Sequence, residues 1–262
     1  MIPLEQIKNF YPDFLKNNIV FQKYILKEYI LLLILDYLSA TSFIRKITFI
    51  GGTSIRLTKG IDRFSEDLDF DCKSFSKDEF AIMTEGVIKN LGKNGFSVKI
   101  KEKDDNKLKA FRCNIYFPEL LFEMGISGHR DERFLIKIEC QDQLVDYVPM
   151  ISNIKGCGFF FPMPVPPPAV LCAMKVSAAL NRQKGRDFYD AMYLLSQTTP
   201  DFKFLSERCG ISNLDELKQA ALKIFKTVDL KTKMKDFDHL LFNKSNSSKI
   251  LRAPEFFESL GA

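Results

Sequence analysis

Three aspartates alternate with apolar residues in residues 65–71, whose sequence is SEDLDFD. Successive side chains of a β-strand point to opposite faces, so Asp67, Asp69 and Asp71 would share one face while the apolar residues point into a core. Neighbours on that face lie roughly 7 Å apart, close enough for two carboxylates to bind one or two divalent cations. Mg²⁺ prefers such oxygen ligands. We expect Asp67 and Asp69 to bind Mg²⁺ or Mn²⁺; a solvated acidic edge strand is the alternative for the isolated pattern.

A glycine turn precedes these aspartates. Gly51 and Gly52 follow the β-rich residues 46–50 and predict a tight turn, after which we expect a short helix from Thr53 to about Lys59. Two glycines let the backbone approach a phosphate group, and the free N–H groups of a helix N-terminus can bind it. Such a turn is weak evidence by itself. Its position within about fifteen residues of the aspartates strengthens the prediction of a nucleotide phosphate site.

A second charged segment lies around residue 180. Lys175 and Arg182 are seven residues apart, which places them on one helical face with small alanines between them. Lys175 would neutralise the phosphates of a nucleoside triphosphate, and Arg182, Lys184 and Arg186 would bind the triphosphate or an RNA backbone. The alternative for Lys184 and Arg186 is a solvated turn.

These segments together resemble the AbiEii/MenT-type family of nucleotidyltransferase toxins, which belongs to the polymerase-β-like nucleotidyltransferase superfamily. The resemblance is carried by FIGGTSIRL at residues 49–57, RFSEDLDF at residues 63–70 and the basic segment at residues 169–190. It implies that Asp67 and Asp69 are the catalytic metal-binding pair and that Asp71 lies just beyond the motif. From the last motif it implies a catalytic Lys175 and Asp187, with Asp190 in nucleotide binding. The ordinary alternative for Asp187 is a favourable charge in the first turn of a helix.

The same resemblance implies a third carboxylate on a neighbouring strand. Glu139, at the end of the β-like residues 134–139, is the best candidate, and Asp142 is the fallback. Such a group can bind a metal or accept the proton of an attacking hydroxyl. Strand alternation places Glu139 on the same face as Lys137. A surface glutamate near a strand end is the alternative.

Three more residues near the motif are candidates. Ser65 lies two positions before Asp67, so its hydroxyl would share the strand face and reach metal or phosphate. Similarity to the MenT-type proteins also makes Ser65 a candidate for inhibitory phosphorylation. Arg56 and Arg63 would bind phosphate or pair with an acid.

The elements that position these residues follow from hydrophobic periodicity. Residues 18–39 predict a buried helix, residues 64–72 a strand, and residues 76–91 a helix with a capping box at its start. Three further β-like runs, 96–101, 111–117 and 134–139, complete a mixed sheet. Five prolines in residues 161–168 predict a stiff, non-helical connector, followed by helices at 168–181 and 186–196. The fold class is therefore α+β: a nucleotidyltransferase domain at residues 1–160 with N-terminal helices and a mixed sheet, and a helical domain at residues 161–262.

Composition excludes several classes of protein. The chain has 262 residues, 46% hydrophobic, which is enough for a sizeable core, and its net charge of +5 permits an anionic partner without requiring one. Six scattered cysteines form no C-x-x-C pair, and only two histidines are present, so we expect no structural zinc site. The N-terminal residues lack the features of a signal peptide, and the longest apolar run is too short to span a bilayer. We expect a cytoplasmic protein with no membrane partner.

The expected function is transfer of a nucleoside monophosphate from an NTP to an acceptor hydroxyl. The resemblance implies that the acceptor is the 3′ end of tRNA and that the protein is a growth-arresting toxin neutralised by a cognate antitoxin protein. A small molecule or a protein side chain is the alternative acceptor, and a catalytically inactive binding module of the same fold is the alternative from another class. A purely regulatory RNA-binding protein would need cations interleaved with exposed aromatics.

Overall fold

The structure is a computed structural model, and it describes residues 2–100 and 110–261. The chain divides into two compact units. The first contains residues 1–60, 64–143 and 151–165, and the second contains residues 61–63, 144–150 and 166–262. The long helical segment of the second unit thus begins at Pro166, inside the proline-rich stretch, and two short segments from earlier in the chain, 61–63 and 144–150, also belong to this unit.

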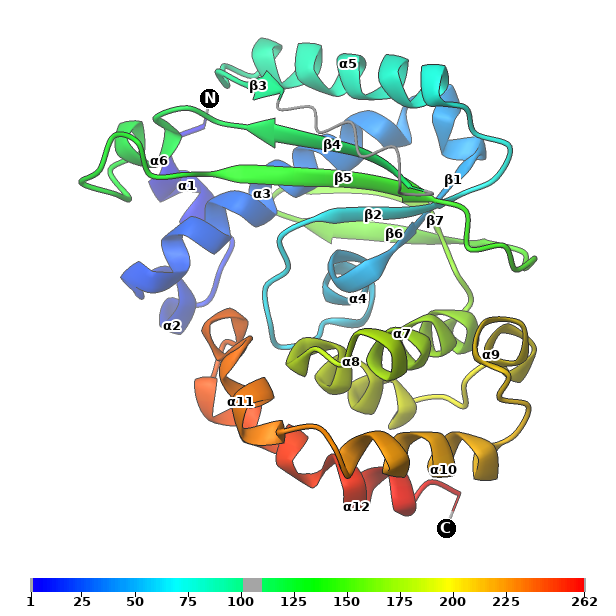
Figure 1. The fold of residues 1–262 in the computed structure, drawn as a ribbon. Coiled ribbons are helices and arrows are strands. Elements are labelled where there is room, and N and C mark those ends of the chain that lie inside the picture. Colours follow the sequence, from blue (N-terminus) through cyan, green and yellow to red (C-terminus); the bar gives the residue numbers. More distant parts are fainter. Residues whose placement is uncertain (1, 101–109, 262) are drawn as a thin grey trace. The chain divides into compact units, whose positions relative to one another are not determined.

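A mixed sheet organises the first unit (Figure 1). Its described strands follow the order β1-β2-β5-β4-β3. The central pair, β2 and β5, is parallel, and the other neighbours are antiparallel. The strands have these bounds: β1 Ile47–Ile50, β2 Leu68–Cys72, β3 Lys99–Ile100, β4 Phe111–Tyr116 and β5 Leu135–Gln141.

Alternating side chains give this sheet one buried and one more polar face. In β5, Ile136, Ile138 and Cys140 are completely buried, while the residues between them are half-buried. Residues that face each other across paired strands lie on the same side of the sheet, so the register of neighbouring strands defines which side chains share the polar face. The candidate site is on that face.

Helix α5 packs on the apolar side of the sheet, where its Phe80 ring stacks on Phe111 of β4. Helix α3 is buried along most of its length, as expected for a helix enclosed in a core, and this confirms the predicted buried helix. The helices of this unit have these bounds: α1 Leu4–Lys8, α2 Asp13–Lys16, α3 Ile19–Ser39, the 3₁₀ helix η1 Ser42–Arg45, α4 Gly51–Lys59, α5 Lys77–Lys93 and α6 Leu120–Glu123.

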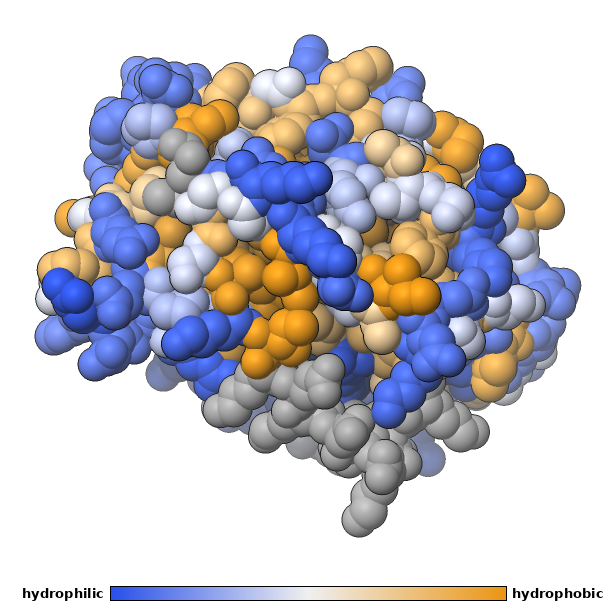
Figure 2. Space-filling view, turned by 90° about the horizontal axis from the view of Figure 1, so that it is seen from above, coloured by the Kyte–Doolittle hydropathy of each residue, from blue (hydrophilic) through white to orange (hydrophobic). Residues whose placement is uncertain are grey.

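The N-terminus of α5 is a capping box. The Ser76 hydroxyl accepts a hydrogen bond from the backbone N–H of Glu79, and the Glu79 carboxylate accepts one from the backbone N–H of Ser76. The predicted cap is confirmed. Seen from the side of α5, the surface carries hydrophobic side chains between hydrophilic ones (Figure 2).

Two sequence predictions about strands were wrong in detail. Strand β2 begins at Leu68 rather than residue 64: the three consecutive polar residues 65–67 precede the first paired residue of the strand. Residues 161–165 are not an open connector: they lie in strand β7 Phe159–Val165, which pairs with β6 Met150–Gly156. Proline lacks an N–H donor, but a two-stranded sheet leaves one edge of each strand free and so accommodates alternate prolines. The predicted strand at residues 96–101 shrinks to β3, with Lys101 outside the described residues.

The second unit is helical. Two helices flank the basic turn, the name used here for Arg182, Lys184 and Arg186, as predicted. They are α7 Pro168–Arg182, which starts with a proline at its first position, and α8 Gly185–Leu195. The remaining elements are α9 Phe202–Cys209, α10 Leu214–Phe225, α11 Leu230–Lys235, η2 Asp238–Leu240, η3 Lys244–Arg252 and α12 Ala253–Glu258. Within the described residues, no helix combines the length and the apolar character needed to cross a bilayer.

Candidate active site

Asp69 lies directly against the glycine turn. Strand β1 ends at Ile50, which is the register partner of Asp69 on β2. The next residue, Gly51, has a φ of +81°, and a Cβ atom placed there would collide with the Asp69 carboxylate. Glycine at this position therefore serves two purposes: it adopts a positive φ without strain, and it leaves room for the carboxylate. The structure thus brings together the predicted glycine turn, Gly51 and Gly52, and the aspartate strand.

Thr53 fixes the position of Asp67. Its hydroxyl donates a hydrogen bond of 2.5 Å to the backbone carbonyl of Asp67. The threonine is buried, so its side chain ties the first turn of α4 to the segment that leads into β2. The nucleotide contact predicted for Thr53 stays a prediction; the contact that the structure shows is this hydrogen bond to Asp67.

Glu139 lies beside Asp69, as register partner on the parallel strand β5. Its carboxylate accepts a hydrogen bond of 2.7 Å from Arg112 and one of 3.3 Å from Lys137. Burial raises the pKa of Glu139, but the hydrogen bond from Arg112 and the charge of Lys137 outweigh it, and the pKa is lowered overall. Glu139 is therefore firmly ionised and already paired with two cations.

The other two acids of this region have structural partners. Asp71 is buried and accepts a hydrogen bond from the backbone N–H of Gln143. Asp142 pairs with Lys73 at 2.7 Å. Both contacts link β2 to the end of β5, so neither acid is directed to the Asp67 and Asp69 pair by these contacts.

The carboxylates of Asp67 and Asp69 fit a divalent cation in their chemistry. Both are oxygen donors of the kind that Mg²⁺ and Mn²⁺ take. The Asp67 side chain is 28% exposed, and the Lys137 ammonium lies 3.7 Å from its carboxylate, so this position already attracts a positive charge. In the described part of the chain, no group of three or more His, Cys, Asp or Glu residues is arranged to hold a metal.

A buried ion cluster holds the motif residues of the second unit. Asp190 is completely buried and accepts hydrogen bonds of 2.7 and 2.6 Å from the Arg63 guanidinium. Lys175 lies 2.9 Å from the same carboxylate. Burial raises the pKa of Asp190, but the charges of Arg63 and Lys175 overcome this effect and bring the pKa down to about 2. Within this unit Asp190 orients two cations, which differs from the nucleotide contact expected for it.

The start of α8 carries the next acid. Asp187 is buried, and its Oδ1 accepts a hydrogen bond of 2.8 Å from Arg182. Its Oδ2 has no hydrogen-bond partner among the described residues. Lys184, at the N-cap of α8, is exposed and Arg186 is half-buried. The predicted basic turn is therefore partly engaged, with Arg182 held by Asp187 and the next two cations near solvent.

Arg56 and Ser65 complete the predicted set. The Arg56 guanidinium makes two hydrogen bonds, of 2.9 and 3.2 Å, to the buried Glu28 carboxylate of α3. Glu28 also accepts a hydrogen bond from Tyr11. This pairing accounts for Arg56 without a nucleotide. Ser65 is half-buried in the irregular segment before β2.

Sequence reasoning did not assign roles to Arg112 and Lys137. Their signal is weak: Lys137 alternates with Glu139 on β5, but Arg112 reaches Glu139 only through the pairing of β4 with β5, which the sequence does not specify. Arg63 was considered only for phosphate or a surface acid, and its partner is 127 residues away in the chain.

The fold, with the glycine turn beside Asp67 and Asp69, is that of the nucleotidyltransferase class. The chain belongs to the AbiEii family, the nucleotidyl transferase toxins of type IV toxin–antitoxin systems, whose model matches residues 33–243.

Solved structures support the same fold. MenT4, a nucleotidyltransferase toxin of Mycobacterium tuberculosis, superposes with a TM-score of 0.58 at 16% identity, covering 100% of this chain and 91% of its own. JHP933 of Helicobacter pylori gives a TM-score of 0.55 at 19% identity, covering 90% of this chain and 91% of its own. A second H. pylori structure, described as a nucleotidyltransferase, gives 0.56 at 19% identity, covering 90% and 93%. The search of curated proteins found no match.

Proposed function

We propose that this protein transfers a nucleoside monophosphate from an NTP to the 3′-terminal hydroxyl of tRNA, and that it acts as the toxin of a toxin–antitoxin pair in the cytoplasm. The observation that carries the proposal is the Asp69 carboxylate packed against Gly51, beside Asp67, in a chain of the AbiEii family. The tRNA acceptor is suggested by the family resemblance and by the cations near the aspartates and in the basic turn.

The metal would be held by Asp67 and Asp69. When bound, a divalent cation neutralises phosphate charge and lowers the pKa of an acceptor hydroxyl. The remaining work falls to the chain. The Gly51–Gly52 turn admits phosphate oxygens to the backbone N–H groups at the start of α4. Such positioning and charge stabilisation are the main contributions that phosphoryl-transfer enzymes make.

Glu139 is assigned a positioning role. Its lowered pKa makes it a weak proton acceptor near neutral pH, since a general base is most effective when its pKa lies near the working pH. Its hydrogen bonds hold Arg112 and Lys137 beside the aspartate pair. These two cations then offset the negative charge of incoming phosphates.

The basic turn would supply further phosphate contacts. Lys175 is oriented by Asp190, and its side chain remains 9% exposed, which would leave its ammonium able to contact a phosphate. Arg182, Lys184 and Arg186 would hold the triphosphate or the tRNA backbone, and the partly unsatisfied Asp187 keeps Arg182 in place. Phosphate contacts of this kind position an RNA without reading its sequence.

A transfer assay tests the proposal. Wild-type protein, the Asp69→Asn variant and an Asp78→Asn control are each incubated with total tRNA, Mg²⁺ and one labelled NTP at a time. Asp78 is exposed at the start of α5 and leaves the site untouched. We expect label in tRNA with wild type and the control, and at least a hundredfold less with Asp69→Asn. The proposal is contradicted if none of the labelled NTPs gives labelled tRNA with wild type, or if Asp69→Asn labels tRNA as well as wild type does. A requirement for a cognate antitoxin is tested by expressing the protein alone, which should arrest growth only if Asp69 is intact.

A further inference from the structure

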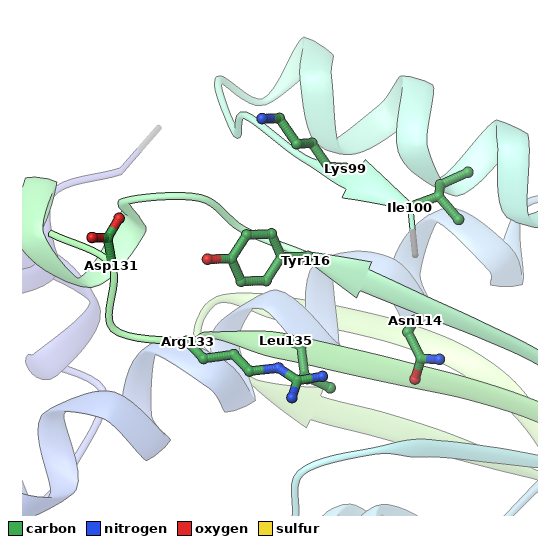
Figure 3. A pocket seen from close by; sticks show the side chains of 7 residues that line it. All are labelled: Lys99, Ile100, Asn114, Tyr116, Asp131, Arg133 and Leu135. Carbon is green, nitrogen blue, oxygen red and sulfur yellow. The ribbon is translucent and has the colours of Figure 1, made fainter. Parts of the chain in front are cut away.

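A pocket lies on the polar face of the sheet, near the edge strand β3, where β4 ends and β5 begins. It has a volume of about 430 Å³ and is lined by residues of three adjacent strands and of the segment before β5: Lys99, Ile100, Asn114, Tyr116, Asp131, Arg133 and Leu135. Figure 3 shows the Tyr116 ring between the side chains of Lys99 and Arg133. None of these residues is part of the family motifs discussed above.

Strand register places this pocket on the same face as the aspartate pair. Asp69 is the partner of Glu139, and Leu135 of the same strand β5 is the partner of Tyr116. Tyr116 in turn faces Lys99 on β3. Glu139 and Leu135 differ by an even number of residues, so both point to one side of the sheet. Four residues of strand separate the two rows, a distance of about 13 Å.

The intervening row on this face is polar as well. Lys137 of β5 faces Asn114 of β4, so a continuous path of polar side chains leads from the aspartates to the pocket. The Lys137 ammonium contacts both Asp67 and Glu139. A chain of phosphates laid along β4 and β5 would therefore pass Lys137 between the aspartates and the cations of the pocket.

The lining of the pocket has the chemistry of a single-stranded nucleic-acid site. Tyr116 is half-buried and offers a ring face for stacking, and Lys99 and Arg133 are exposed. Neither cation forms an ion pair with another described residue. Asn114 adds an amide donor and acceptor. Proteins bind single strands by combining aromatic stacking platforms with cations that follow the phosphates.

We propose that this pocket is an acceptor-strand subsite that binds a nucleotide a few positions from the reacting 3′ end, with the base on Tyr116 and the phosphates on Arg133 and Lys99. The proposal rests on the proposed function and extends it by assigning the residues that hold the RNA. The separation of about 13 Å from the aspartates favours the acceptor strand over the nucleoside of the NTP, whose phosphates must lie at the metal.

Equilibrium binding tests the subsite independently of transfer. A labelled single-stranded oligoribonucleotide with the sequence of a tRNA 3′ end is titrated with the Asp69→Ala protein, so that no reaction occurs, and anisotropy is followed. In this background Tyr116→Ala should weaken RNA binding about tenfold to a hundredfold, the usual effect of losing one stacked base, while Tyr116→Phe should stay within about twofold. Binding of each NTP, measured by calorimetry, should be unchanged by both substitutions.

A surface substitution provides a second test that does not depend on packing. Arg133→Gln should weaken RNA binding and reduce the slope of log K against log salt by about one. The matched control is Arg45→Gln, since Arg45 is also exposed in the first unit but lies in η1. Unchanged RNA binding by Tyr116→Ala and Arg133→Gln overturns the subsite. Weakened NTP binding with unchanged RNA binding also overturns it, because the pocket would then hold the nucleoside triphosphate. If RNA binds as expected and wild type still transfers no label, the proposed function fails while the subsite stands.

Discussion

Removal of the Asp190 carboxylate should destabilise the protein strongly. In the Asp190→Ala variant, the Arg63 guanidinium and the Lys175 ammonium would lose the carboxylate that pairs with them at 2.6 and 2.9 Å. Arg63 is 1% exposed, so water could not solvate its charge unless the unit opened locally. Breaking a buried pair by removing one partner typically costs about 3–5 kcal/mol. We expect a loss of that size in the free energy of unfolding, measured by urea titration followed by circular dichroism.

The controls for this experiment separate burial from charge. Asp236→Asn removes an exposed carboxylate that lies 4.0 Å from Lys233, and it should change the free energy of unfolding by no more than about 0.5 kcal/mol. Replacing the whole cluster with apolar residues, as Arg63→Met, Lys175→Met and Asp190→Leu together, should recover much of the stability because no unpaired charge is left. The same triple variant should have no transferase activity, since Lys175 is part of the proposed phosphate site. An Asp190→Ala variant as stable as wild type would refute the reasoning.

The same cluster predicts a dependence on pH. The folded-state pKa of Asp190 is about 2, below its ordinary value of 3.8. A carboxylate whose pKa is lowered by folding contributes stability that is fully present above the unfolded pKa and is lost as pH falls through the folded pKa. The difference corresponds to about 2 kcal/mol. The difference in free energy of unfolding between wild type and Asp190→Ala should therefore narrow as the pH falls from about 4 to about 2, the interval set by these two pKa values.

Three further substitutions test the local architecture. Gly51→Ala should abolish transfer and lower stability by about 1–3 kcal/mol, because it strains a positive φ and pushes a methyl group into the Asp69 carboxylate; transfer assays and thermal melts measure the two effects. Ser76→Ala should cost about 1 kcal/mol, since it removes the N-cap of α5, and should leave transfer intact. Arg56→Met should cost about 3 kcal/mol by leaving the buried Glu28 without its cation, again measured by urea titration.

The control for the glycine substitution is Gly92→Ala. Gly92 lies inside α5, where an added Cβ meets no atom within 4 Å, and its φ is not positive. Alanine there should stabilise the helix by about 0.5–1 kcal/mol. A Gly51→Ala protein with wild-type activity would show that the turn does not need glycine. Losses below about 1 kcal/mol for Arg56→Met would show that the Glu28 pair is not a stabilising contact.

Local signals in the sequence predicted much of the first unit. Alternation identified the aspartate strand, the apolar run identified α3, and the serine followed by glutamate three residues later identified the start of α5. These features depend on residues close together in the chain. The extent of β2 was misjudged because the polar and apolar alternation holds only from Asp67 onward, and the polar residues 65–67 do not join the sheet.

Contacts between distant residues were not predictable in the same way. The sequence indicated that Arg63 and Asp190 are charged, but only the packing of residues 61–63 in the helical unit brings them together. Likewise, Tyr116 and the two cations of the proposed RNA subsite come together across three strands and the segment before β5, not along one segment, so no pattern in the sequence indicates them. The β6–β7 hairpin was missed because its prolines argue against a strand unless one edge is free.

The division of the chain has a consequence for engineering. Because residues 61–63 complete the helical unit, a fragment that starts at Pro166 would carry Asp190 and Lys175 but no Arg63. A chimaera that exchanges the helical unit should therefore also carry residues 61–63 and 144–150, which belong to the same unit. A substitution of Asp190 removes the partner of Arg63, which lies more than a hundred residues earlier in the chain. We therefore expect these two positions to change together.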